Sequence, residues 1–198
     1  MIDDYTQLRG RKALRCSQVL DAASICFVDK GFHGAGMAEI ADQAQMSTGH
    51  IYHYFRNKDA IIKAIVIREG QRVLELVQEL RQLPADSFAE FLIDRLDEHL
   101  IGDETLFQSR LSFEILAESQ RNPEIAGLLR ENESRKTEVI ENILREKFDR
   151  DDIPDIVDAL NTLFAGVSAS SVRLGKTDGA RLSPALRRFL RDLFAEKR

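Results

Sequence analysis

The chain has 198 residues, enough for one sizeable hydrophobic core or for a small module joined to a larger one. Its composition is 43% hydrophobic and 31% charged, with four prolines and no tryptophan, which is ordinary for a globular protein and favours helix over strand. No segment approaches the roughly 18 to 20 unbroken apolar residues of a membrane span, and the acidic start lacks the apolar region of a signal peptide, so we expect a soluble cytoplasmic protein.

The net charge of −5 is unevenly distributed. Residues 1–68 carry nine lysines and arginines against seven acidic residues, a local charge of +2, whereas the remainder carries −7. A locally basic segment on an acidic chain can still bind phosphates. The charge therefore does not exclude a nucleic-acid partner.

Caps and helix breakers divide the chain into about nine helical segments. Gly31 ends the first segment, at a position where a left-handed C-cap is usual. Ser47 caps the third segment and Asn57 caps a long fourth one. The first four helices are expected over residues 11–30, 37–44, 48–55 and 57–82.

The second half of the chain also contains residues typical of helix starts. Ser87 and Glu90 have the spacing of a capping box, and Asn122-Pro123 places an N-cap before a proline that is tolerated at the first helical position. The later helices are expected to begin near residues 87, 103, 122, 152 and 183. No alternating stretch is long enough to predict a sheet, so the fold class is all-α.

The most informative segment is residues 37–55, MAEIADQAQMSTGHIYHYF. A short helix, a turn and a second short helix are the layout of a DNA-reading helix-turn-helix. A shared apolar wedge joins the two helices: Ile40, Ala44, Met46 and Ile51. The second helix also carries hydroxyl, imidazole and phenol groups that can reach phosphates and base edges: Thr48, His50, Tyr52 and His53.

Here the chain resembles the TetR family of transcriptional regulators. The matching residues are Gly31-Phe32, Met37-Ala38-Glu39-Ile40-Ala41, Ala44, Met46-Ser47, Gly49, Ile51-Tyr52, Tyr54-Phe55 and Lys58. So many positions at fixed spacing are more specific than a short motif. The resemblance implies a DNA-binding domain over residues 1–56 and a ligand-binding and dimerisation domain over residues 57–198. It implies a dimeric repressor, not an enzyme, that binds a palindromic operator in double-stranded DNA.

The resemblance also assigns roles to individual residues. Residues 48–55 would be the recognition helix, with bases or nearby phosphates contacted by Thr48, His50 and His53, and with Gly49 allowing close approach. Phosphate contacts are expected from Tyr52, Tyr54 and Lys58, although one of the tyrosines could equally belong to the core. Basic residues near the N-terminus could reach phosphates or the minor groove: Arg11, Lys12 and Arg15.

Two positions depart from the family pattern. Gln45 occupies a turn position that is usually glycine, and a positive φ at a residue other than glycine costs about 1 kcal/mol. Gly36 stands at a helix cap that is often threonine or serine, and glycine weakens such a cap by only a few tenths of a kcal/mol.

The resemblance places the homodimer interface in the last two helices, residues 153–174 and 184–197. The run of small residues at 165–171 permits close helix approach, although a helix buried inside one subunit would look similar. Apolar area would come from Val157, Leu160, Phe164, Leu186, Leu190 and Phe194. Three arginines of the last helix, Arg187, Arg188 and Arg191, are either a second DNA surface or exposed and dimer-rim charges.

A small-molecule effector would bind among the helices between residues 57 and 174. Aromatic residues mixed with a few charged ones can line such a cavity, although packed aromatics also describe plain core. The candidate lining residues are Phe91, Phe107, Arg110, Phe113, Glu114, Leu116 and Phe164.

Other chemistry finds little support. His50 and His53 lie one turn apart but have no acidic or cysteine partner at matching spacing, so we expect no metal and no cofactor. Glu114 and Glu118 share a helical face, for which exposure to solvent is the default expectation. Two rival functions stay open: a similar DNA binder whose C-terminal domain answers to a protein partner or to nothing, and a helical enzyme.

Overall fold

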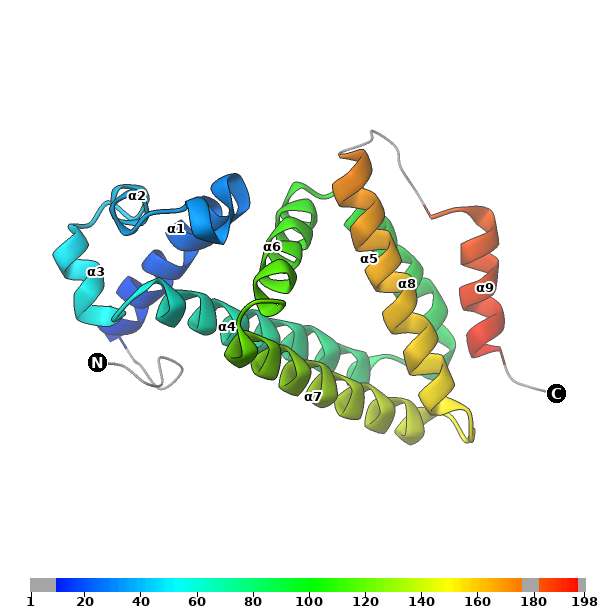
Figure 1. The fold of residues 1–198 in the computed structure, drawn as a ribbon. Coiled ribbons are helices and arrows are strands. Elements are labelled where there is room, and N and C mark those ends of the chain that lie inside the picture. The colour runs from blue at the N-terminus through cyan, green and yellow to red at the C-terminus, as the bar shows by residue number, and fades with distance from the viewer. Residues whose placement is uncertain (1–9, 176–181, 196–198) are drawn as a thin grey trace. The chain divides into compact units, whose positions relative to one another are not determined.

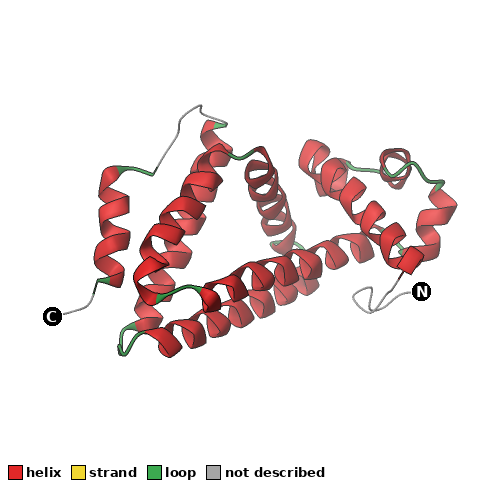
Figure 2. Ribbon diagram, turned by 180° about the vertical axis from the view of Figure 1, so that it is seen from behind, coloured by secondary structure: helices red, strands yellow, loops and turns green. Residues whose placement is uncertain are grey.

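The computed structural model describes residues 10–175 and 182–195. In these ranges every regular element is a helix (Figure 2), which confirms the all-α class. The helices, labelled in Figure 1, are α1 (Gly10–Gly34), α2 (Met37–Gln43), α3 (Thr48–Tyr54), α4 (Lys58–Glu79), α5 (Phe88–Ile101), α6 (Asp103–Ser119), α7 (Pro123–Lys147), α8 (Ile153–Leu174) and α9 (Pro184–Phe194). Short 3-10 turns η2 (Leu80–Gln82) and η3 (Ala85–Ser87) separate α4 from α5. None of these helices is long and apolar enough to cross a membrane.

The described residues form two compact units. The first contains the chain up to Arg72 together with Leu111–Asn132, and the second contains Val73–Arg110 together with the chain from Glu133 onward. Three helices, α4, α6 and α7, therefore contribute residues to both units. The first unit holds the predicted helix-turn-helix.

The core of the first unit is formed by the apolar faces that the sequence predicts. Leu20, Ala23 and Phe27 of α1 are at most 1% exposed. Ile40 of α2 and Ile51 of α3 are completely buried, as expected for the wedge that holds the two helices together. Burial of a large aliphatic side chain contributes roughly 1.5 to 3 kcal/mol, so these contacts fix the pose of α3.

The first helix does not simply end at Gly31. This residue has a non-helical backbone (φ 75°, ψ 159°), but the chain resumes one further helical turn to Gly34. The reason is Phe32, which is 3% exposed and packs edge-on against Phe27 with 5.2 Å between ring centroids. Glycine permits the break because, without a Cβ, it can adopt this positive φ at no steric cost.

The second unit packs α5, the end of α7, α8 and α9 around one core. Phe88, Phe148 and Phe194 form an aromatic cluster with centroid separations of 5.5 to 5.8 Å. The capping box predicted at Ser87 is wrong, because the Ser87 side chain makes no capping hydrogen bond. The carboxylate of Glu90 instead accepts from the Arg191 side chain, whose Nε lies 2.6 Å away.

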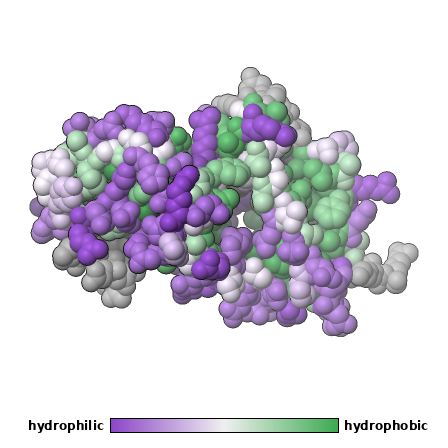
Figure 3. Space-filling view, in the orientation of Figure 1, coloured by the Kyte–Doolittle hydropathy of each residue, from purple (hydrophilic) through white to green (hydrophobic). Residues whose placement is uncertain are grey.

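Ion pairs attach α9 to α5. Arg187 pairs with Asp97, and the other Asp97 oxygen accepts from the Leu182 backbone N–H at 2.7 Å. Two of the three arginines of this helix are thus engaged with carboxylates of α5. Apolar side chains gather over α8 and α9 in the space-filling view (Figure 3). Of these two helices, Leu174 of α8 is 67% exposed and Phe189 of α9 is 43% exposed.

Candidate nucleic-acid interface

The first helix of the motif starts at the unusual cap that the sequence indicates. Gly36 is the N-cap of α2, and its N–H donates to Oε2 of Glu39 at 3.0 Å. The other Glu39 oxygen accepts from Lys30 at the end of α1. These hydrogen bonds, first from Lys30 and then from Gly36, lower the pKa of Glu39. Glu39 thereby joins α1 to the start of α2.

The turn between α2 and α3 carries the predicted backbone strain. Gln45 has a φ of 52° and is the one residue other than glycine with a positive φ in the described ranges. Main-chain hydrogen bonds hold it there, including Met46 N–H to the Ala41 carbonyl at 2.9 Å. Gln18 of α1 donates to the Ala44 carbonyl at 2.7 Å. The departure from glycine is therefore accommodated by the surrounding hydrogen bonds and not by a change of turn.

The helix α3 is fixed on one side and exposed on the other. Ser47 caps it, with Oγ accepting from the His50 N–H at 3.2 Å, and Ile51 anchors it in the core. Thr48 is half-buried, and four further predicted contact residues of α3 are exposed: Gly49, His50, Tyr52 and His53. Such an exposed row of hydrogen-bonding groups on a short helix is suited to a groove of DNA.

Gly49 has no internal reason to be glycine. A Cβ placed on it would meet no atom of the protein within 4 Å. The protein's own packing would therefore accept a side chain at this position. The predicted reason, close approach of an external molecule, stays a prediction.

The two tyrosines of α3 have different surroundings. Tyr52 is 49% exposed, whereas Tyr54 is 8% exposed and belongs to the core. The Tyr54 hydroxyl lies 3.3 Å from Nε2 of His50. Of the two predicted phosphate contacts, Tyr52 alone presents its ring to solvent.

Lys58 lies in a place that sequence reasoning missed. Its ammonium donates to the main-chain carbonyls of Phe32, His33 and Ala35, at 2.5, 3.3 and 2.9 Å. It also lies 4.6 Å from the centroid of the Phe32 ring. An ammonium has three donors, so contact with a phosphate requires Lys58 to release a carbonyl. Its neighbour Asn57 caps α4 as predicted, accepting from the Ala60 N–H at 2.9 Å.

The basic residues at the start of α1 are all exposed: Arg11, Lys12 and Arg15. Arg15 donates to the side chain of Gln18 at 2.9 Å, and Gln18 in turn holds the turn before α3. The exposed cations therefore belong to the helix that supports the helix-turn-helix.

Two carboxylates of α6 contact the end of α1. Glu114 accepts from the Phe32 N–H at 2.5 Å, and Oε2 of Glu118 lies 3.0 Å from Nε2 of His33. Glu118 is 5% exposed, so the expectation of a solvated face was wrong. Residues one turn apart on a helix share a face, but only the fold shows that this face meets α1.

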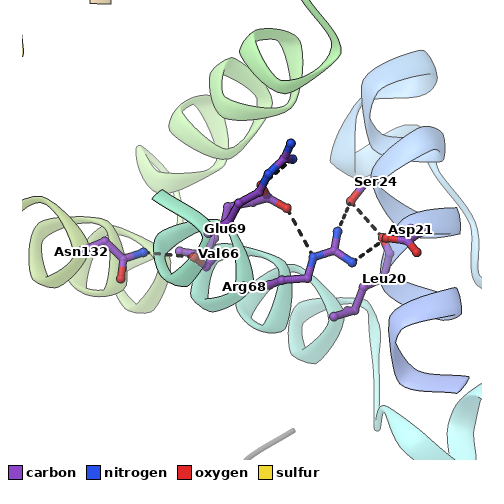
Figure 4. A network of polar contacts seen from close by, with 8 residues as sticks. Leu20, Asp21, Ser24, Val66, Arg68, Glu69 and Asn132 are labelled. Carbon is purple, nitrogen blue, oxygen red and sulfur yellow. Dashed lines mark hydrogen bonds and ion pairs between the residues drawn. The ribbon is translucent and has the colours of Figure 1, made fainter. Parts of the chain in front are cut away.

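Polar contacts also attach α4 to its neighbours (Figure 4). Arg68 reaches from α4 to α1, where it donates to Asp21 at 2.6 Å and to Ser24 at 3.4 Å. On α7, Asn132 donates to the Val66 carbonyl of α4 at 3.0 Å. The middle of α4 is thus linked through side chains to both α1 and α7.

The predicted effector residues are divided between the two units. Phe91 and Phe164 pack against the core of the second unit. Phe107 and Arg110 are also residues of the second unit, whereas Phe113 and Glu114 are residues of the first unit. Glu114 is already engaged with the end of α1. A separate groove of about 970 Å³ along α4 and α7 contains none of the predicted effector residues; its lining includes Tyr54, Lys63, Leu128 and Glu131.

The described residues offer little chemistry of another kind. They contain no group of three or more His, Cys, Asp or Glu side chains that could hold a metal ion. The thiols of Cys16 and Cys26 are both buried, and burial is the main cause that raises the pKa of each. A thiol of raised pKa is a poor nucleophile.

Comparison with known proteins supports this interpretation of the site. Residues 19–65 match the family model described as bacterial regulatory proteins, tetR family. The HTH-type transcriptional regulator UidR of Escherichia coli strain K12 is 30% identical over 147 residues, which are 74% of this chain and 73% of UidR. Such relatives are transcriptional regulators and not enzymes.

Solved structures show the same fold. GusR of Salmonella enterica has 25% identity and a TM-score of 0.65, with 93% of this chain and 95% of GusR covered. FadR of Bacillus subtilis, solved in complex with stearoyl-CoA, has 21% identity and a TM-score of 0.69, with 90% and 96% covered. The chain belongs to the TetR family of DNA-binding transcriptional regulators.

Proposed function

We propose that the protein is a repressor that binds a palindromic operator as a homodimer and is released by a small molecule. The observation that carries the proposal is α3, whose outer side exposes His50, Tyr52 and His53 while Ile51 locks its inner side into the core. Residues 1–56 would bind DNA, and residues 57–198 would bind the effector and form the dimer. Thr48, Gly49, Tyr52 and the α1 cations would complete the DNA contacts.

The apolar surface of α8 and α9 supports the proposed dimer. Leu174 and Phe189 are exposed, and the small residues Ala165, Gly166 and Ala169 of α8 are exposed as well. Large exposed apolar side chains next to small ones favour close packing against a second copy. Sedimentation should give a dimer for the wild type and a monomer for Phe189→Asp. Leu14→Asp, at an exposed leucine on α1, should stay dimeric.

Effector release is supported by the contacts of α6 with the end of α1. Glu114 and Glu118 lie near the end of a helix that begins in the second unit, so a ligand that shifts α6 would disturb Phe32 and His33. FadR shows that this fold can hold a small molecule. Because coupling between sites is reciprocal, a ligand that weakens DNA binding must itself bind DNA-bound protein less well.

The first test is selection of bound sequences from random duplex DNA, with wild type and with Tyr52→Ala. The proposal predicts an enriched palindrome whose enrichment the variant loses. No enrichment at low salt, where phosphate binding is strongest, would count against operator binding. A reporter gene placed under control of the selected sequence would then show whether the protein represses or activates transcription, since repression requires lower expression with the protein present.

The effector is tested next, with the operator as a probe. Metabolites that release the protein from the operator should also raise its melting temperature without DNA. Arg110→Ala should weaken this response if the expected pocket is right, and an unchanged response would remove Arg110 from it. If no small molecule acts, a C-terminal domain that answers to a protein partner becomes the better account.

A further inference from the structure

Tyr54 connects the two exposed histidines of α3 to the core. The residue is 8% exposed. Its ring lies 5.3 Å from the His50 ring and 5.2 Å from the His53 ring between centroids, and it meets the His53 ring edge-on at 80°. Among the described residues, its hydroxyl makes a polar contact with Nε2 of His50 alone, at 3.3 Å. A buried phenol between two exposed imidazoles can control how they are presented.

The geometry points to Tyr54 as a positioning residue for base recognition: its hydroxyl holds the imidazole of His50 so that Nδ1 faces the DNA. This inference rests on the proposed DNA-reading role of α3. A histidine ring nitrogen that is held by one partner determines the proton and the direction of the other nitrogen. Tyr54 would then act on sequence preference without touching DNA itself.

The inference explains why the residue is tyrosine although it is buried. A phenylalanine would fill the same mostly buried position and would keep the ring contact with His53. Only the hydroxyl requires tyrosine, and a partly buried hydroxyl is retained at low cost when it has a partner. Its partner is the exposed His50.

The test is Tyr54→Phe, which keeps the ring and removes the hydroxyl. In selection from random DNA, we expect the variant to bind the wild-type palindrome but to lose about 2- to 10-fold of its preference at one base pair of each half-site, the effect of one net hydrogen bond. Tyr52→Phe, which loses an exposed hydroxyl, should instead weaken all sequences equally, as a phosphate contact does.

Double variants separate positioning from general damage. Tyr54→Phe and His50→Ala should be non-additive, because both remove the same contact, whereas Tyr54→Phe and His53→Ala should be additive, because phenylalanine keeps the ring beside His53. Additive effects with both histidines, or an unchanged base preference in Tyr54→Phe, would overturn the inference.

A measurement without DNA makes the inference independent of the operator. The ring nitrogens of His50, observed by long-range ¹H–¹⁵N NMR in the free full-length protein, should show one dominant tautomer in wild type and a mixture in Tyr54→Phe. Equal tautomer populations in both proteins would contradict it. Failure of wild type to select any sequence would instead contradict operator binding, so the two failures are distinguishable.

Discussion

The buried carboxylate of Glu118 faces the exposed imidazole of His33, with 3.0 Å between Oε2 and Nε2. The Glu118 side chain is 6% exposed and that of His33 is 68% exposed. Within the described residues Oε2 has no hydrogen bond, and the His33 imidazole is the basic group beside it. The pair lies where α6 meets the end of α1. Because one partner is buried and the other is exposed, removal of His33 and removal of Glu118 should change the stability of the fold by different amounts.

This asymmetry predicts unequal effects for the two partners. His33→Ala should destabilise the protein by about 1 kcal/mol because it leaves a buried carboxylate without a counter-charge. Glu118→Leu should be neutral or stabilising, because an apolar side chain replaces a buried charge. In the Glu118→Leu background, His33→Ala should lose its effect. Denaturant melts of the four proteins measure this, and an unchanged effect of His33→Ala in that background would contradict the pairing.

The close approach of α4 to α7 at Gly70 predicts a second stability difference. A Cβ on Gly70 would lie 2.4 Å from Nδ2 of Asn132, the side chain that donates to Val66. Gly70→Ala should therefore destabilise by about 1 to 3 kcal/mol through overpacking. Gly127→Ala on α7 is the matched control, because its Cβ would meet nothing within 4 Å. It should stabilise by up to about 1 kcal/mol through helix propensity.

Backbone strain at the turn before α3 predicts a stabilising substitution. Gln45 has a φ of 52°, a conformation that glycine adopts without a steric penalty. Gln45→Gly should raise the free energy of unfolding by roughly 0.5 to 1 kcal/mol. Gln43→Gly, at the last residue of α2, should lower it by a similar amount. If both variants changed the free energy of unfolding in the same direction, the positive φ of Gln45 would carry no strain.

The three carbonyl contacts of Lys58 predict that it matters for stability as well as for DNA. Lys58→Met should cost about 1 to 3 kcal/mol, because it removes charge-assisted hydrogen bonds at the end of α1. Lys63→Met is the control, since Lys63 pairs with Glu124, which is 71% exposed, and should change stability by less than about 1 kcal/mol. Thermal denaturation without DNA measures both.

The lowered pKa of Glu39 predicts a pH dependence. The folded pKa lies below the ordinary glutamate value of 4.5, so the contact with Lys30 stabilises the fold fully above that value and is lost as the pH falls through the folded pKa. Glu39→Gln should be less stable than wild type at neutral pH and should converge with it in strong acid. Lys30→Met should converge in the same way. A difference that persists at low pH would assign the effect to packing.

Local signals in the sequence determined much of the fold. The caps Ser47 and Asn57 hydrogen-bond as predicted, Gln45 has a positive φ at the turn position where glycine is usual, and the wedge of Ile40 and Ile51 is buried. Each of these depends on residues within a few positions of one another, where spacing alone specifies the partner. The helix-turn-helix could therefore be identified before its geometry was known.

Only the tertiary structure decided the partners of charged groups distant in sequence. Lys58 holds carbonyls at the end of α1 and just beyond it, Glu114 accepts from Phe32, and Glu90 pairs with Arg191 in place of capping α5. These pairs are 23 to 101 residues apart, and helical periodicity says which residues share a face but not which helix covers it. Long side chains find such partners only after the apolar faces have packed, because hydrophobic burial sets the positions of the helices first.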